Sequence, residues 1–287
     1  MSLVSDPAAG SAGASGPVSG HRRLPVGALF GDVDSTRLPL PVTAAALVTI
    51  AALAATALAG PGLFAALLAV LALIVALGWP LLCGAAGMMQ VQAGTAGGGL
   101  LVAATVGMTT GPHRLVWLPV AVAIGMIATY FLQLLRADRH RLTEAMGVTM
   151  TGLACVSSGA ALVPLTLTEP GVRFLFIGLA GMAAGGLAEL TGRVRVIGGR
   201  SMLVVMLAGA LTGWLVAGAV GVAGASGPVG LGLGMLVATF SVSARRVFGT
   251  VPGARELPGQ VALGVGTVLL PGVLVLALGG IAKVLPG

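Results

Sequence analysis

From residue 41 onward the sequence is a succession of long apolar stretches, separated by short turns that carry most of its charge. A helix rises about 1.5 Å per residue, so about 20 apolar residues cross the hydrocarbon core of a bilayer. Hydrophobic residues make up 57% of the 287 residues and charged residues only 8%, whereas soluble domains carry roughly 25% charged residues. A soluble fold could not bury this much apolar surface. We therefore expect an all-α, polytopic integral membrane helical bundle.

Nine transmembrane helices are predicted, at residues 41–60, 62–84, 91–110, 115–135, 145–167, 172–190, 201–223, 227–243 and 260–282. Together they form a transmembrane domain over residues 41–287. Residues 1–40 are rich in Gly, Ser, Ala and Pro and are predicted to be a disordered cytosolic tail. The third span contains Gln92 and three consecutive glycines at 97–99. It is either a full crossing or a broken, re-entrant helix.

The cationic residues alternate between the two ends of these spans. If the N-terminus is cytosolic, twelve of the fifteen Lys and Arg lie on the cytosolic side, and Arg114, Arg173 and Lys283 lie outside. Cytosolic loops of membrane proteins carry an excess of Lys and Arg, so we predict a cytosolic N-terminus and an external C-terminus. The preference for Arg over Lys suggests a bacterial plasma membrane. The alternation also favours a full crossing by the third span, because this brings Arg136–Arg141 to the cytosolic side.

Composition and missing motifs exclude several classes of function. The net charge of +7 does not indicate a nucleic-acid partner, because the cations lie in short loops and have anionic lipid headgroups as counter-charge. The P-loop, HExxH, CxxC and GxSxG patterns do not occur, and Cys83 and Cys155 are interpreted as isolated packing residues. None of the eight Asp and Glu falls at mid-membrane depth, which argues against a proton relay. No catalytic residue, metal ligand or cofactor is predicted.

The candidate site is a set of polar side chains at the cytosolic ends of the last four spans. Its members, candidates for binding a lipid headgroup or another ligand, are Glu189, Arg193, Arg195, Arg200, Arg245 and Arg246. Guanidinium groups bind phosphate through paired hydrogen bonds, so a phospholipid or a phosphorylated lipid is a chemically sensible ligand. The alternatives are an ion pair between Glu189 and Arg193, four residues apart on one helix, and orientation signals that bind anionic lipid loosely.

Other residues have structural interpretations. Glu144 begins the fifth span, where a carboxylate complements the helix dipole. Trp79, Trp117 and Tyr130 fall near span ends and are predicted to anchor the helices at the membrane interface, whereas Trp214 falls inside the seventh span and is predicted to pack within the bundle. Glycines four residues apart predict close helix packing. They occur as Gly181 and Gly185, Gly209 and Gly213, and Gly230 and Gly234.

Three short stretches follow one another in the C-terminal half, namely Ala188–Arg193, Ser243–Arg246 and Glu256–Gly259. The first is an acid-containing helix end that leads into a basic loop, and the other two form a basic and acidic loop with a Leu-Pro-Gly sequence. Over residues 135–282 this order resembles the bacterial phosphatidate cytidylyltransferases, also called CDP-diacylglycerol synthases. The resemblance implies a helical membrane enzyme that transfers a cytidylyl group to a lipid phosphate with the help of a divalent metal.

The chain departs from that family at the residues that carry its chemistry. It has Glu189 where the family has Asp, and Gly198–Ser201 where the family has a stretch of the Ser-Pro-Lys-Lys-Thr type. The family's Lys-Asp pair, its His-Gly-Gly and its metal-binding Asp are missing, and Gln260 follows Gly259. The chain therefore lacks the residues that the family uses for metal-dependent transfer of the cytidylyl group.

Three functions remain. The first is a non-catalytic, lipid-associated membrane protein, with anionic lipid headgroups as partners and other membrane proteins or further copies of the chain as alternatives. It is preferred because acidic residues are scarce and small residues are plentiful. The second is a transporter or permease for a small or lipidic solute, which the irregular third span favours. The third is a divergent lipid enzyme like the phosphatidate cytidylyltransferases.

Overall fold

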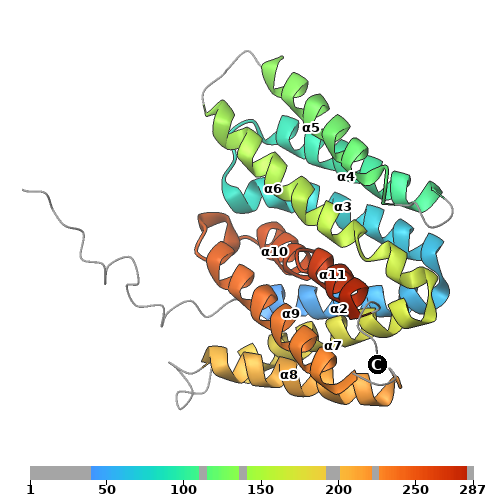
Figure 1. The fold of residues 1–287 in the computed structure, drawn as a ribbon. Helices are drawn as coiled ribbons and strands as arrows, with labels where there is room; N and C mark the ends of the chain where they lie inside the picture. Colours follow the sequence, from blue (N-terminus) through green and yellow to red (C-terminus); the bar gives the residue numbers. More distant parts are fainter. Residues whose placement is uncertain (1–39, 110–114, 136–140, 192–200, 222–225, 283–287) are drawn as a thin grey trace, which may run out of the picture. The chain divides into compact units, whose positions relative to one another are not determined.

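The structure of the chain, a computed structural model, describes residues 40–109, 115–135, 141–191, 201–221 and 226–282. The chain divides into two units, Met1–Ser35 and Thr36–Gly287. Every described residue belongs to the second unit. Residues 1–39 of the predicted tail lie outside the described residues. The helices are α2 (Leu40–Ala59), α3 (Pro61–Cys83), α4 (Met88–Met108), α5 (Leu118–Leu134), α6 (Leu142–Ala160), η2 (Val163–Leu167), α7 (Glu169–Thr191), α8 (Ser201–Ala219), α9 (Ser226–Phe248), η4 (Pro252–Arg255), α10 (Leu257–Leu269) and α11 (Gly272–Ala282) (Figure 1).

Eight helical segments in the described part of the chain are long and apolar enough to cross a membrane. One of them joins α6 to η2, as Leu142–Leu167, and another joins α10 to α11, as Leu257–Gly280. The remaining apolar helix, α5, has 17 residues. Each predicted span coincides with one of these segments, so the prediction of an all-α, multi-pass membrane bundle is confirmed. The third span is the uninterrupted helix α4.

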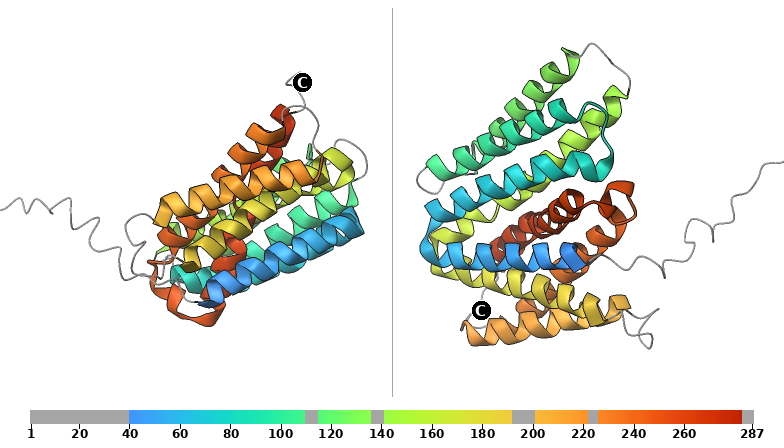
Figure 2. Two further views of the ribbon diagram at one scale, coloured as in Figure 1. Left: turned by 90° about the horizontal axis from the view of Figure 1, so that it is seen from below. Right: turned by 180° about the vertical axis from the view of Figure 1, so that it is seen from behind.

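Helix α10 lies at the centre of the bundle, against α2, α3, α6 and α9. Every residue from Ala262 to Leu269 is buried, and Figure 2 shows this segment between α2 and α3 when the molecule is seen from behind. Small residues allow the close approach. A Cβ atom at Gly264 would lie 2.6 Å from the carbonyl oxygen of Val42, and one at Gly266 would lie 2.9 Å from the ring of Trp79.

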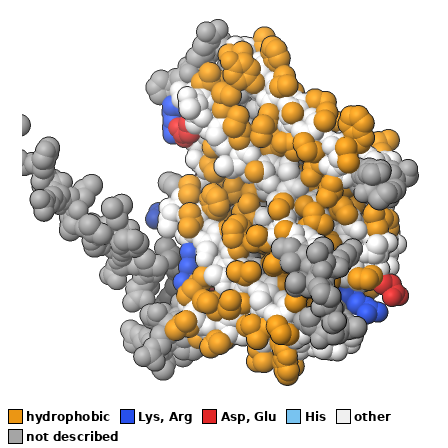
Figure 3. Space-filling model, in the orientation of Figure 1, with side chains coloured by type: hydrophobic (Ala, Val, Ile, Leu, Met, Phe, Trp, Pro, Cys, Tyr) orange, Lys and Arg blue, Asp and Glu red, His pale blue; other side chains and the backbone are white. Residues whose placement is uncertain are grey.

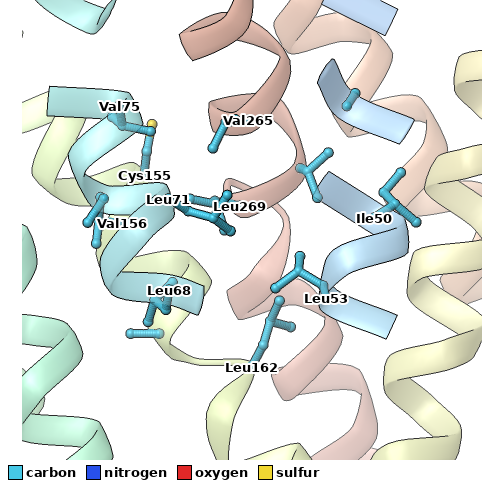
Figure 4. Packing of buried hydrophobic residues seen from close by; sticks show 14 of the residues in the cluster. Ile50, Leu53, Leu68, Leu71, Val75, Cys155, Val156, Leu162, Val265 and Leu269 are labelled. Atoms are coloured by element: carbon cyan, nitrogen blue, oxygen red, sulfur yellow. The ribbon is translucent and has the colours of Figure 1, made fainter. Parts of the chain in front are cut away.

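Apolar side chains of α2, α3 and α6 pack around α10 (Figure 4). Figure 4 shows Leu53 of α2, Leu68 and Leu71 of α3, Val156 of α6 and Leu269 of α10 within one cluster of buried residues. In a bilayer the surrounding lipid tails are as apolar as these side chains, so transfer from water does not favour their burial. Close van der Waals packing therefore holds the helices together.

The aromatic residues correct two predictions. Trp79 is fully buried, its indole Nε1 donates to Thr151 Oγ1 over 3.1 Å, and its ring centroid lies 5.1 Å from that of Phe248. Its predicted role as an anchor exposed to the membrane interface is therefore wrong, because a tertiary partner satisfies the indole inside the bundle. Trp214 is 50% exposed on the outer face of α8, so its predicted packing within the bundle is also wrong. Tyr130 is exposed, as an interfacial position requires.

The predicted glycine contacts are confirmed where α7, α8 and α9 meet. A Cβ atom at Gly181 of α7 would lie 2.8 Å from the Cα atom of Gly234 of α9. From the other side, a Cβ atom at Gly209 of α8 would lie 2.6 Å from the carbonyl oxygen of Gly234, and one at Gly213 would lie 2.9 Å from its Cα atom. Three helix backbones therefore converge on one position that has no room for a side chain.

The last crossing is interrupted between α10 and α11. Pro271 has no backbone N–H, so the helical hydrogen-bond pattern ends before it. Ser158 of α6 supplies hydrogen-bond partners at this interruption. Its hydroxyl donates to the carbonyl of Leu270 over 2.6 Å and accepts from the N–H of Val273 over 3.1 Å. A side chain at Gly272 would collide with the carbonyl oxygen of Ser158. One hydroxyl thus satisfies two backbone groups that lipid could not.

We predict that Ser158→Ala lowers the free energy of unfolding by about 1–3 kcal/mol, because the carbonyl of Leu270 and the N–H of Val273 both lose their partner. The measurement is thermal unfolding of the purified protein in detergent. Ser157→Ala is the matched control. The Ser157 hydroxyl donates to the carbonyl of Leu153 in its own helix, and this carbonyl keeps its backbone hydrogen bond when the hydroxyl is removed. Equal shifts of Tm in the two variants would contradict the role of Ser158.

Candidate functional site

Charged side chains of the described chain lie at the two ends of the helices. Figure 3 shows basic and acidic side chains at opposite margins of one face, with hydrophobic side chains between them. At the start of α7, Arg173 pairs with Glu169 and donates to the carbonyl of Gly221 over 3.0 Å. The other end of α7 carries Glu189, about 30 Å away along the helix axis. The start of α6, with the pair Arg141–Glu144, lies on the same side of the view as the end of α9 (Figure 1).

The candidate site is centred on Arg245, near the end of α9. Its side chain is fully buried. Its Nε donates to Thr267 Oγ1 of α10 over 3.3 Å, and one Nη donates to Ser241 Oγ, one turn earlier on α9, over 3.1 Å. Its other Nη lies 3.5 Å from a carboxylate oxygen of Glu189 on α7. The guanidinium group therefore joins three helices.

The two carboxylate oxygens of Glu189 face two different guanidinium groups. One oxygen faces Arg245, and the other lies 3.7 Å from Nε of Arg246. Hydrogen bonds between guanidinium and carboxylate groups are typically about 2.7–2.9 Å long, so both contacts are loose. The side chain of Glu189 is 11% exposed and that of Arg246 is 31% exposed. These three residues, here called the arginine cluster, carry a formal charge of +1.

Local sequence explains how a guanidinium group is accommodated between packed helices. A Cβ atom at Gly186 would lie 3.1 Å from an Nη atom of Arg245, so the missing side chain on α7 provides the space for the cation. Gly185, on the same helix, lets Ala238 of α9 approach closely. Thr267 donates its hydroxyl proton to the carbonyl of Gly264 over 3.0 Å, which leaves its oxygen lone pairs for Arg245.

The structure brings together half of the predicted site residues. Glu189, Arg245 and Arg246 meet in the arginine cluster, whereas the other predicted members lie outside the described residues; they are Arg193, Arg195 and Arg200. The predicted pair of Glu189 with Arg193 lies outside them as well. Sequence reasoning missed Ser241 and Thr267. The position of Ser241, one helical turn before Arg245, was a usable signal, whereas Thr267 becomes a partner through tertiary packing alone.

Glu144 has a partner that the sequence interpretation did not name. Both of its carboxylate oxygens accept hydrogen bonds from Arg141, from Nε and from one Nη. The pair stands at the start of α6, where the carboxylate also complements the helix dipole.

The arginine cluster has the chemistry of an anion site. Its one carboxylate already faces two cations, so a divalent metal would be repelled by the guanidinium groups and would find few oxygen ligands. In the described parts of the chain, no three His, Cys, Asp or Glu side chains gather into a metal-binding group. The donor set therefore does not fit the metal that the phosphatidate cytidylyltransferase resemblance implies. Phosphate suits it, because guanidinium forks bind phosphate oxygens in pairs.

No family model matches the chain, and no curated protein and no solved structure matches it either. The resemblance to the phosphatidate cytidylyltransferases therefore stays a prediction. The apolar helices alone establish a multi-pass membrane protein, and the interpretation of its site depends on its own residues.

We predict that Glu189→Gln lowers the free energy of unfolding by about 3–5 kcal/mol, because it removes a counter-charge of the buried Arg245. Thermal unfolding in detergent measures the change. Glu169→Gln is the control, since it removes the carboxylate of a pair whose glutamate is 87% exposed, and exposed pairs contribute little. A Glu189→Gln protein as stable as the control variant would show that Arg245 does not depend on this carboxylate.

Proposed function

We propose that this protein is a non-catalytic, lipid-associated membrane protein that binds the phosphate of an anionic phospholipid at the arginine cluster. The observation that supports this function is the sharing of one carboxylate between Arg245 and Arg246. A phosphate oxygen that approaches Arg246 meets a guanidinium group that is 31% exposed. Arg245, held by Ser241 and Thr267, adds a fixed positive charge behind it.

The charge balance of the whole chain favours the same ligand. Fifteen Lys and Arg stand against eight Asp and Glu, so the protein cannot neutralise its cations with its own carboxylates. Anionic lipids at a membrane surface attract a nearby Lys or Arg by about 1 kcal/mol each. Because the arginine cluster lies at the end of two membrane-spanning helices, the phosphate groups of membrane phospholipids are the nearest external negative charges.

We further propose that the end of the bundle with the arginine cluster faces the cytosol, in a bacterial plasma membrane. This follows the bias of Lys and Arg toward cytosolic loops. It gives a cytosolic N-terminus and an external C-terminus. Single cysteines, introduced into a Cys83→Ala, Cys155→Ala background, test the arrangement with a membrane-impermeant thiol reagent on whole cells. A cysteine at Glu169 is expected to react from outside and one at Arg255 only after the cells are opened; the reverse result would invert the proposed topology.

The two alternatives meet specific obstacles in the described residues. A lipid enzyme of the phosphatidate cytidylyltransferase kind would use the same phosphate chemistry, but the arginine cluster lacks the ligands for its metal. A transporter would be favoured by the interruption at Pro271, because unwound helices often line solute sites. The backbone groups at this interruption are bound by Ser158, so they are not available to a solute.

We expect Arg246→Gln to weaken the binding of phosphatidylglycerol by about tenfold, because it removes one charge-assisted contact worth about 1.5 kcal/mol or more. The measurement is titration of the protein in nanodiscs with phosphatidylglycerol, followed by native mass spectrometry, with phosphatidylcholine as the zwitterionic comparison. Arg173→Gln, at the other end of α7, is the control and is expected to leave binding unchanged. Equal losses in both variants, or no preference for the anionic lipid, would overturn the proposed function.

A further inference from the structure

Arg245 and Arg246 are consecutive residues of α9, yet their side chains lie in different surroundings. Successive residues of an α-helix point in directions about 100° apart. The Arg245 side chain has no exposed surface, whereas that of Arg246 is 31% exposed. A ligand at this end of the bundle can therefore touch Arg246, and it cannot touch Arg245. Any effect of Arg245 on the ligand has to pass through another residue.

Glu189 of α7 is the residue that both guanidinium groups face. One carboxylate oxygen lies 3.5 Å from an Nη atom of Arg245, and the other lies 3.7 Å from Nε of Arg246. The two separations are nearly equal, so both cations attract the carboxylate to a similar degree. A carboxylate that stands between two cations cannot close fully on either one. The position of Glu189 relative to Arg246 therefore depends on the charge of Arg245.

Arg245 is held in place on its other sides by neutral groups. Its Nε donates to Thr267 Oγ1 over 3.3 Å, and one Nη donates to Ser241 Oγ over 3.1 Å. Hydroxyl groups fix the guanidinium group without cancelling its charge. The Glu189 side chain is only 11% exposed, and attraction between charges is stronger where water is excluded. Arg245 thus presents a fixed positive charge to Glu189 from inside the bundle.

We propose that Arg245 is a positioning residue for the lipid phosphate. It draws the carboxylate of Glu189 toward the interior of the bundle and so limits how far Glu189 neutralises Arg246. The phosphate contacts Arg246, Glu189 is a competing anion built into the protein, and Arg245 sets the balance between the two anions. This inference rests on the proposed function, since it concerns the same bound phosphate.

The two single substitutions have opposite effects on this balance. Without the charge of Arg245, Glu189 closes on Arg246 and competes with phosphate more strongly. Arg245→Gln is therefore expected to weaken the binding of phosphatidylglycerol by up to about tenfold, the loss expected when Arg246 itself is replaced. Glu189→Gln is expected to strengthen binding several-fold, because it removes the competing anion. Titration of each variant in nanodiscs with phosphatidylglycerol, followed by native mass spectrometry, measures both changes.

A double variant, Arg245→Gln with Glu189→Gln, separates a positioning role from a purely structural one. It removes both charges of the buried pair together, which avoids the uncompensated buried charge that Glu189→Gln alone leaves. Because the competing anion is gone, we expect the double variant to bind phosphatidylglycerol at least as tightly as the wild type. A loss of affinity caused only by disturbed packing around Arg245 would persist in it.

A matched double variant tests whether such a rescue reflects total charge alone. Glu256 lies at the same end of the bundle, between η4 and α10, and its exposed side chain makes no capping hydrogen bond. Arg245→Gln with Glu256→Gln has the same net charge as the first double variant but keeps the carboxylate beside Arg246. We expect it to bind phosphatidylglycerol as weakly as Arg245→Gln alone.

Thermal unfolding in detergent confirms that each variant is folded before its binding is compared. The proposal is overturned if the double variant with Glu189→Gln binds no more tightly than the one with Glu256→Gln, and this comparison decides even where Glu189→Gln alone does not fold. Weaker binding by Glu189→Gln than by the wild type would overturn it too. Failure of the proposed function is distinct, because the wild type would then show no preference for phosphatidylglycerol over phosphatidylcholine.

Discussion

Backbone groups and charged side chains that this chain carries into the membrane region have to find their partners within the protein, because lipid tails offer none. Two side chains show how the fold meets this constraint. Ser158 satisfies both backbone groups left open at the break before α11. Arg245, fully buried, is surrounded by Ser241, Thr267 and Glu189. Removing such partners leaves a polar or charged group in apolar surroundings, which costs far more than the same change at a surface exposed to water.

The positions of the helices follow from the sequence, whereas the interior contacts do not. Length and hydropathy place each crossing, since a helix in lipid satisfies its own backbone and needs no partner to form. The side on which a residue faces is a different matter, because lipid-facing and interior positions are equally apolar. Trp79 and Trp214 illustrate this: one is enclosed by Thr151 and Phe248, and the other points outward. In a soluble protein, the pattern of polar and apolar residues along each helix would have distinguished the buried tryptophan from the exposed one.

The same limit applies to the candidate site. A carboxylate and a pair of arginines at the ends of two helices are visible in the sequence, and their meeting follows once α7 packs on α9. The burial of Arg245 is not visible, because it depends on the absence of a side chain at Gly186. Thr267 is equally hidden, since it belongs to a third helix. The chemistry at the site is therefore set by contacts between segments distant in sequence.

The convergence of α7, α8 and α9 on Gly234 has a mechanical consequence. Where backbone meets backbone, no side-chain rotation can absorb a displacement, so these three helices resist sliding and tilting against one another. They behave as a stiff block that keeps Glu189 and Arg245 at a constant separation. The contact of α5 with α6 is less extensive, and the flexible side chains of Met126, Met146 and Met150 line the hollow between these two helices, so this part of the bundle has more freedom to adjust.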